Sequence, residues 1–389
     1  MAKEETLNLD RESKSPILPL FENDWALRFG GPRKAAFAVV IAYAPLAVLG
    51  ALQGLAWGPT RAQSVLLDPA ILARFLVALP ILILASSTCS CTVDAVARQF
   101  QDAELVTEPD QQRYAAIIDS ANRLRKSRAA TWICVALAYA YSALLVPQFL
   151  PTISPSWRTL GPEGHRSLSF AGWWFVIVSQ PIYLVVLLNF LYRTALWWQF
   201  LWKTSRLNLQ LHAVHPDGAG GLGFLGLTLF AFRMPAFAIS ASFAGSFATL
   251  VLIDGVRVRQ LEYAIVAVML FVIGLFVYPL TAFYYRELSR ARQRDVLDYW
   301  KLYGVQLRQL EKKWIRSDSR PADMLSVADF SEVIDLSSIL WNARQMSLRP
   351  FQRNGIVFLV FAASLPFLAV LALEIPILEI LKAILKMMD

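Results

Sequence analysis

The stretch Ala129-Ala-Thr-Trp-Ile-Cys-Val-Ala-Leu-Ala-Tyr-Ala-Tyr-Ser-Ala-Leu-Leu-Val-Pro-Gln-Phe-Leu150 decides the fold class, because none of its side chains is charged. A helix needs about 20 apolar residues to cross the roughly 30 Å hydrocarbon core of a bilayer, so this stretch predicts a membrane-spanning helix. We therefore predict an all-α polytopic membrane protein with about seven transmembrane helices. Six more segments are comparably apolar, and each holds one proline: Ala35–Trp57, Ile71–Thr88, Phe170–Trp202, Leu222–Ile253, Tyr263–Tyr285 and Gly355–Leu373.

The composition and the distribution of charge support this class. Hydrophobic residues make up 56% of the 389-residue chain, its mean hydropathy is +0.47, and its formal net charge is +8. If the N-terminus is cytoplasmic, most Lys and Arg residues fall on the cytoplasmic side. The positive-inside rule then predicts an N-in, C-out orientation. The basic charge is explained by this topology, so we expect the lipid bilayer, and no nucleic acid, as a partner.

The polar stretches divide the chain into membrane and cytoplasmic parts. The N-terminal part lacks the short apolar core and the small-residue cleavage site of a signal peptide. At the other end, charged residues recur three and four positions apart among Ile and Leu, which is typical of an amphipathic helix on a membrane surface. The expected parts are a cytoplasmic N-terminal segment (1–34), a six-helix membrane region (35–285) with cytoplasmic loops at 89–128 and 203–221, a cytoplasmic helical hairpin (286–353), a seventh transmembrane helix (354–373) and an amphipathic outer-face helix (374–389).

Within the expected hairpin, apolar residues recur at alternating spacings of four and three, which is the seam of about three heptads. Either these residues pack in the hydrophobic core between the two helices of the hairpin, or they form an interface with another subunit. We expect a homo-oligomer, and a cytoplasmic protein partner could also bind through 286–353. The seam residues are Val296, Trp300, Tyr303, Leu307, Leu310 and Trp314.

Two apolar segments are longer than one crossing requires. Phe170–Trp202 would be about 50 Å long as a helix, so its last turns are expected to extend into the cytoplasm. Leu222–Ile253 contains Arg233-Met-Pro235 near its middle and is expected to be broken there.

The connection between the fourth and fifth segments reads His215-Pro-Asp217-Gly-Ala-Gly-Gly221-Leu-Gly. At these residues the chain resembles a family of uncharacterised bacterial multi-pass membrane proteins marked by a His-Pro-Asp-x-Ala-Gly-Gly-Leu-Gly loop. The match covers about Arg193–Arg233. The resemblance implies a location in the bacterial inner membrane and supplies no activity, so the loop must be interpreted from its chemistry.

Three interpretations of this loop are open. In the first, the loop is a turn and helix cap, in which a carboxylate accepts hydrogen bonds from the amides that follow it. In the second, free amides at the glycine-rich helix start bind an anion or phosphate, with His215, Asp217, Gly218, Gly220 and Gly221 as the site. In the third, the loop contributes to a transition-metal or haem site whose ligands would be His212, His215, Asp217, Cys89 and Cys91.

Arg233 is the charged residue nearest the centre of any apolar segment. A charge at that depth is costly, so it normally faces a cavity or a partner. Beside a helix broken at Pro235, an arginine would suit an anion pathway. The alternative is that Arg233 lies at the membrane boundary and reaches the lipid phosphates with its long side chain.

We predict an integral membrane channel or transporter for a small solute or ion, with an anion slightly preferred. One alternative is a signalling or scaffold component that acts through its cytoplasmic loops, and another is a metal- or haem-binding redox protein. The chain lacks the Gly-x-Ser-x-Gly and His-Glu-x-x-His motifs of common hydrolases and proteases, so we do not expect an enzyme. No cofactor is expected unless the metal or haem alternative holds.

Overall fold

The computed structural model describes residues 31–58, 60–149, 156–161, 167–314 and 327–374, and over these residues the chain is almost entirely helical. Seven helical stretches are long and apolar enough to cross a membrane, which confirms the predicted fold class. The spans are Gly31–Leu52, Pro69–Asp102, Arg128–Pro147, Phe170–Thr204, Gly223–Leu252, Val258–Lys312 and Arg353–Leu371.

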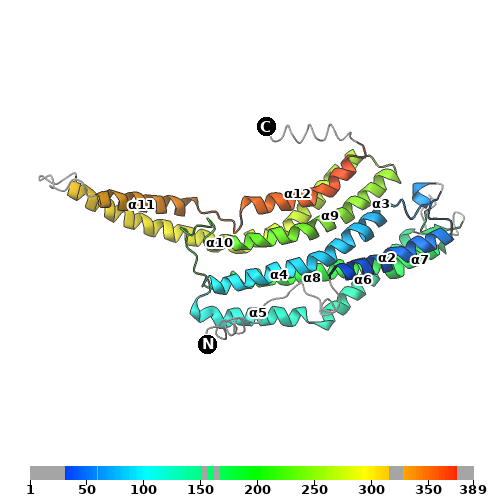
Figure 1. Ribbon diagram of the computed structural model, residues 1–389, viewed down its shortest axis with the longest axis horizontal. Coiled ribbons are helices and arrows are strands. Elements are labelled where there is room, and N and C mark those ends of the chain that lie inside the picture. Colours follow the sequence, from blue (N-terminus) through cyan, green and yellow to red (C-terminus); the bar gives the residue numbers. More distant parts are fainter. Residues whose placement is uncertain (1–30, 59, 150–155, 162–166, 315–326, 375–389) are drawn as a thin grey trace, which may run out of the picture.

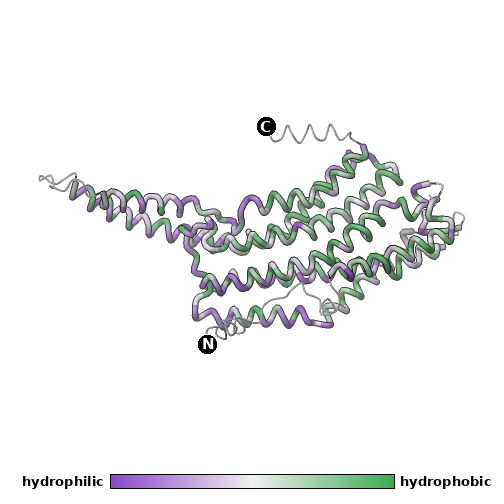
Figure 2. Tube along the Cα trace, in the orientation of Figure 1, coloured by the Kyte–Doolittle hydropathy of each residue, from purple (hydrophilic) through white to green (hydrophobic). Residues whose placement is uncertain are grey.

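The spans lie side by side along the long axis of the molecule, and successive spans alternate in direction (Figure 1). Three of them, α2 (Gly31–Leu52), α6 (Arg128–Phe149) and α12 (Arg353–Leu371), begin partway along the bundle. Hydrophobic residues dominate the bundle. Hydrophilic residues are frequent in those parts of the other helices that continue beyond the starts of α2, α6 and α12 toward the hairpin end (Figure 2). We call the end from which the hairpin projects the inner end.

The second and fourth spans each begin at the outer end with a short α-helix and then contain a π-helical turn. The second consists of α3 (Pro69–Ile71), η3 (Leu72–Ala78) and α4 (Leu79–Asp102). The fourth consists of α7 (Phe170–Trp174), η5 (Phe175–Ser179) and α8 (Gln180–Thr204). A proline lies two residues after the end of each π-helical turn, at Pro80 and Pro181. α8 extends to Thr204, so this segment is a helical span longer than one crossing requires, as expected; that its end lies in the cytoplasm stays a prediction.

The remaining elements are short or connect the spans. They are η2 (Arg61–Gln63), η4 (Glu108–Asp110), α5 (Gln111–Arg125), the paired strands β1 (Thr159–Leu160) and β2 (Ser167–Leu168), and η6 (Gly223–Gly226). α5 packs against α8 at the inner end. There the aromatic rings of Phe100, Tyr114, Phe200 and Tyr284 form a compact cluster, with centroids of contacting pairs 6.1–6.5 Å apart.

The fifth span, α9 (Leu227–Leu252), is not broken at Pro235, contrary to our expectation. Proline cannot donate a hydrogen bond to the carbonyl four residues earlier, which is that of Ala231. In the structure the thiol of Cys89 donates to this carbonyl, with a distance of 3.6 Å between sulfur and oxygen. The neighbouring helix α4 thus supplies the hydrogen bond that proline removes, and α9 stays continuous.

α10 (Val258–Trp314) is a single 57-residue helix that crosses the bundle and continues beyond it. α11 (Val327–Gln345) folds back along its far half, and the two project together from the inner end (Figure 1). This confirms the predicted helical hairpin. The predicted amphipathic helix lies outside the described residues except for Glu374, as does the N-terminal segment before residue 31.

One layer of residues indicates where the inner membrane boundary lies. Cys89, Phe190, Ala231 and Phe276 are in contact or close together, and they come from four different helices. At about 1.5 Å per helical residue, each lies about 27–32 Å from the outer end of its own span. A hydrocarbon core of about 30 Å that starts at the outer helix ends would therefore end at this layer.

Candidate functional site

The Asp217 carboxylate organises the glycine-rich loop between α8 and η6. Its Oδ1 accepts hydrogen bonds from the amides of Ala219 and Gly221 at 2.8 and 3.1 Å, and its Oδ2 accepts from Gly223 at 2.7 Å. The ring nitrogen Nδ1 of His215 lies 2.8 Å from Oδ1. The amides that an external anion would use are therefore occupied by the chain's own carboxylate. The carboxylate therefore caps the start of η6, although Asp217 lies six residues before Gly223, the first residue of that helix.

These donors also change the acidity of Asp217. Burial acts to raise the pKa of this carboxyl group, but the hydrogen bonds from Ala219, Gly223, Gly221 and His215 outweigh it and hold the pKa below its ordinary value. The carboxylate is therefore ionised throughout the neutral range. Its charge serves to hold the loop together.

Two glycines let the loop fit between its neighbours. Gly220 and Gly221 have φ angles of +68° and +95°, which L side chains rarely adopt. A Cβ atom at Gly220 would also lie only 2.6 Å from the side chain of Met346. The amide of Ser347 donates to the carbonyl of Gly218 at 2.8 Å. The loop is thus fastened to the segment that joins α11 to α12.

The rest of the connection is fastened to α10. The amide of Ala213 donates to Asp295 at 2.6 Å, and the guanidinium of Arg294 donates to the carbonyl of Leu211 at 2.8 Å. A surface pocket of about 700 Å³ lies beside these contacts, with Arg290 and His212 in its wall. Arg290 and Arg294 each pair with a carboxylate on α10, so the pocket has no excess of positive charge.

The proposed metal ligands do not converge in the described part of the chain, where no group of three His, Cys, Asp or Glu side chains could hold a metal ion. Cys89 is buried and donates to the Ala231 carbonyl, whereas Cys91 is exposed. The metal or haem alternative stays a prediction, with no geometry that supports it.

Arg233 lies on the exposed face of α9. It directly follows Phe232, which stacks on Phe276 in the layer that marks the inner boundary. Its depth and exposure match the alternative in which it reaches the lipid phosphates from the membrane boundary.

Arg74, in the π-helical turn η3, is a half-buried arginine within the membrane region. It donates to the side-chain oxygen of Gln180 at 2.9 Å and to the hydroxyl of Ser246 at 3.4 Å, and it lies over the ring of Tyr183 with 5.5 Å to the centroid. Its Nε is buried without a hydrogen-bond partner. Among the described residues, no carboxylate lies within ion-pair distance of Arg74.

A second arginine lies next to this site. Arg158, from the loop before β1, donates to Asp68 at 2.7 Å and is only 19% exposed. Burial lowers the pKa of its guanidinium, Asp68 counteracts that shift, and the positive charge of Arg74 adds to it. The two guanidinium groups therefore interact electrostatically, and the carboxylates of Asp68 and Asp254 both act to raise the pKa of Arg158.

Asp68 is fully committed to holding the outer end together. It caps α3 through the amide of Ala70 at 3.0 Å, and it also accepts from the indole of Trp157 at 2.9 Å and from the hydroxyl of Thr249 at 3.2 Å. With Arg158 it thus joins two spans, the second and the fifth, to an outer loop. Its carboxylate accepts from these three neutral donors and pairs with Arg158, and Arg74 is not within ion-pair distance of it.

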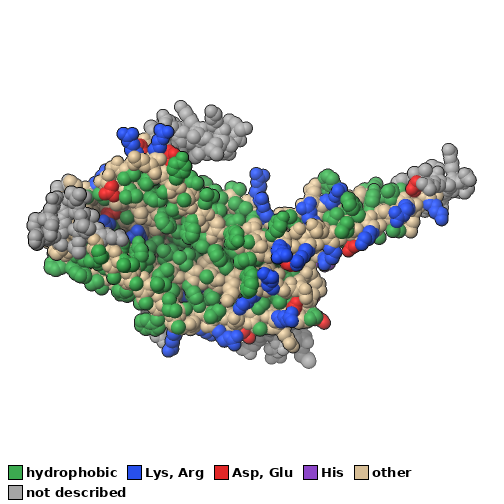
Figure 3. All heavy atoms as spheres, turned by 180° about the vertical axis from the view of Figure 1, so that it is seen from behind, with side chains coloured by type: hydrophobic (Ala, Val, Ile, Leu, Met, Phe, Trp, Pro, Cys, Tyr) green, Lys and Arg blue, Asp and Glu red, His purple; other side chains and the backbone are tan. Residues whose placement is uncertain are grey.

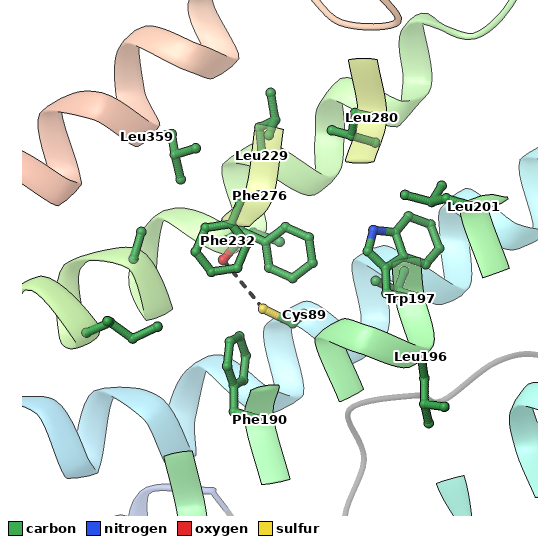
Figure 4. Close-up of a cluster of buried hydrophobic side chains, with 14 of the residues drawn as sticks. Cys89, Phe190, Leu196, Trp197, Leu201, Leu229, Phe232, Phe276, Leu280 and Leu359 are labelled. Carbon is green, nitrogen blue, oxygen red and sulfur yellow. Dashed lines mark hydrogen bonds between the residues drawn. The ribbon is translucent and has the colours of Figure 1, made fainter. Parts of the chain in front are cut away.

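The layer at the inner boundary is apolar by contrast with the surroundings of Arg74. Figure 4 shows the thiol of Cys89 among Phe190, Phe232 and Phe276, with leucine side chains around them. The rings of Phe232 and Phe276 stack with centroids 4.8 Å apart. Aromatic and aliphatic side chains therefore fill the bundle at this layer.

Sequence reasoning missed Arg74 because it lies near the start of its apolar segment and resembles a flanking charge. Its partners Gln180 and Ser246 come from other spans, and no local spacing connects them. Two signals in the sequence could have pointed to this site. One is Arg74 itself, a charged residue within the apolar segment Ile71–Thr88, and the other is Gln180, a polar residue before Pro181 within Phe170–Trp202.

Comparison of the chain with protein-family models, curated proteins and solved structures finds no match. The resemblance of the His-Pro-Asp loop to a family of bacterial membrane proteins therefore stays a prediction, and the function must be argued from the geometry.

Proposed function

We propose that this membrane protein is a transporter or gated channel for a small anion, and that the anion binds at Arg74. The observation that carries the proposal is the arginine itself, half-buried in the outer half of the bundle and held by the neutral groups of Gln180, Ser246 and Tyr183. A buried charge without an opposite charge is costly, and a bound anion removes that cost.

The local backbone supports a binding role. π-helical turns inside α-helices frequently occur at functional sites. Here one such turn carries Arg74, and the other ends at Ser179, directly before Gln180. The Nε of Arg74 is buried without a hydrogen-bond partner, so a bound anion would satisfy a donor that the protein leaves unpaired. Chloride and comparably small anions accept hydrogen bonds from such donors.

The apolar layer at the inner boundary would then be a gate. Phe232, Phe276 and Phe190 fill the centre of the bundle between the Arg74 site and the inner end. An anion at Arg74 could pass only after these rings moved apart. Hydrophobic constrictions gate channels in this way.

The test is anion flux into proteoliposomes that contain the purified protein, measured with a halide-sensitive dye. Arg74→Gln should reduce the flux at least tenfold, while Arg74→Lys, which keeps the charge, should retain part of it. Arg233→Gln is the matched control, because it removes an arginine at the membrane boundary and should leave the flux nearly unchanged.

Two outcomes would overturn the proposal. One is wild-type flux in Arg74→Gln. The other is loss of flux in Arg233→Gln with full activity in Arg74→Gln, which would restore the pathway at Arg233. Thermal unfolding of each variant separates loss of function from loss of the fold.

A further inference from the structure

The hydrogen bonds of Arg74 leave one edge of its guanidinium group almost unused. Nη1 donates to Gln180 at 2.9 Å, which is an ordinary distance, whereas the contact of Nη2 with Ser246 is 3.4 Å long and therefore weak. Nε is buried without a hydrogen-bond partner. Nε–H and one N–H of Nη2 point in parallel from the edge of the group that faces away from Cδ. We call this edge, with its two barely engaged donors, the side edge.

The hydroxyl groups near Arg74 already donate to other acceptors. Tyr183 donates to Ser242 Oγ at 2.6 Å, and Ser242 donates in turn to the carbonyl of Ala238 at 3.1 Å. Ser246 donates to the carbonyl of Ser242 at 3.0 Å. A hydroxyl group has one hydrogen to donate, so these three groups have none left for an anion. An anion beside Arg74 would therefore take its hydrogen bonds mainly from the guanidinium group.

The balance of charge limits the ligand to one negative charge. Asp68 is paired with Arg158 at 2.7 Å, whereas Arg74 has no carboxylate within ion-pair distance in the ranges that the structure describes. A monovalent anion would neutralise Arg74. A divalent anion such as sulfate would bring a second, uncompensated charge against Gln180 and Tyr183, which are only 2% and 4% exposed, and a buried charge without a partner is costly.

The position of the side edge limits the size of the ligand. Figure 3 shows hydrophobic atoms over most of the outer surface of the bundle, with Lys and Arg side chains frequent at the inner end and along the hairpin. Arg74 instead donates to groups on two other spans, Gln180 on the fourth and Ser246 on the fifth, so its guanidinium group faces the interior. Because Nε is buried there, a ligand on the side edge must consist of only a few atoms.

We infer that the anion of the proposed transport function is a small carboxylate or a similar monovalent planar oxyanion, such as formate or bicarbonate, bound by Nε and Nη2 of Arg74. The guanidinium fork matches the two oxygens of a carboxylate, so each oxygen accepts one nearly straight hydrogen bond. A halide is a single acceptor that must share both donors at bent angles, and bent hydrogen bonds are weaker. The inference rests on the proposed anion site and names its ligand.

The test is isothermal titration calorimetry of the detergent-purified protein with sodium formate, sodium chloride and sodium sulfate at constant ionic strength. Formate should bind about tenfold more tightly than chloride, which corresponds to about 1.4 kcal/mol, and sulfate should bind more weakly than either. Arg74→Lys keeps the charge but has no planar edge, so it should bind formate and chloride equally. Arg233→Lys is the matched control, because it makes the same exchange at the membrane boundary and should keep the wild-type preference.

Either of two results would overturn the inference. One is a wild type that binds chloride or sulfate at least as tightly as formate, a result that needs no variant. The other is a folded Arg74→Lys protein that still prefers formate, with folding checked by its thermal unfolding midpoint. In both cases the proposed anion site stands if Arg74→Gln weakens the binding of every anion. If Arg74→Gln binds them all as the wild type does, the proposed site and the inference both fail.

Discussion

Replacing Asp217 by alanine should destabilise the folded protein by about 3–4.5 kcal/mol. The change removes three backbone hydrogen bonds to a carboxylate, from Ala219, Gly221 and Gly223. Hydrogen bonds to charged groups contribute about 1.5–3 kcal/mol each when well buried. The Asp217 side chain is 18% exposed, so we take about 1–1.5 kcal/mol for each.

Two further variants test how this stability is distributed. Asp217→Asn keeps one acceptor oxygen but replaces the other by an amide nitrogen, so it should lose only the bond from Gly223, or about 1–1.5 kcal/mol. His215→Ala leaves all three backbone bonds in place and should cost less than about 1 kcal/mol. The measurement is denaturant unfolding in detergent, followed by tryptophan fluorescence.

The same carboxylate makes stability depend on acid. The pKa of Asp217 is lower in the folded protein than in the unfolded chain. The carboxylate therefore contributes its full stabilisation above the pKa of an aspartate in the unfolded chain. That stabilisation is lost as the pH falls through the lower pKa of the folded protein. The wild type should therefore lose stability more steeply than Asp217→Asn below about pH 4. If the alanine variant unfolds at the wild-type midpoint but loses transport, the loop binds a ligand and our interpretation of it is wrong.

Two other predictions follow from the ends of the bundle. Asp68→Asn should cost about 3–5 kcal/mol, because it removes the buried carboxylate that pairs with Arg158; an unchanged unfolding midpoint would contradict this. Phe276→Ala should raise passive anion leak in proteoliposomes, because it removes one ring of the stacked pair at the inner boundary; a leak equal to that of the wild type would mean that this layer is not a gate.

The fold could be predicted well from the sequence because its main signal is local. Each apolar segment is long enough to define a span by itself, and the seven predicted segments correspond to the seven spans. The hairpin was predictable for the same reason, since its apolar spacing lies within one stretch of chain. Continuity through Pro235 was not predictable, because the compensating donor, Cys89, comes from another helix.

The candidate site was less predictable because its parts are distant in sequence. Asp217 was recognisable, since its partners follow within six residues. Arg74 was not, because its environment depends on Gln180 and Ser246, which lie more than a hundred residues away. The depth of Arg233 also required the structure, since only the packing of four helices locates the inner boundary.

The most direct test of the central claim is a crystal structure of the protein soaked in bromide, with anomalous scattering used to locate the ion. Our account predicts an anomalous peak within hydrogen-bonding distance of the Arg74 guanidinium, on the side of its free Nε, and no such peak in Arg74→Gln. A bromide peak at Arg233 or in the Asp217 loop, with none at Arg74, would contradict the account.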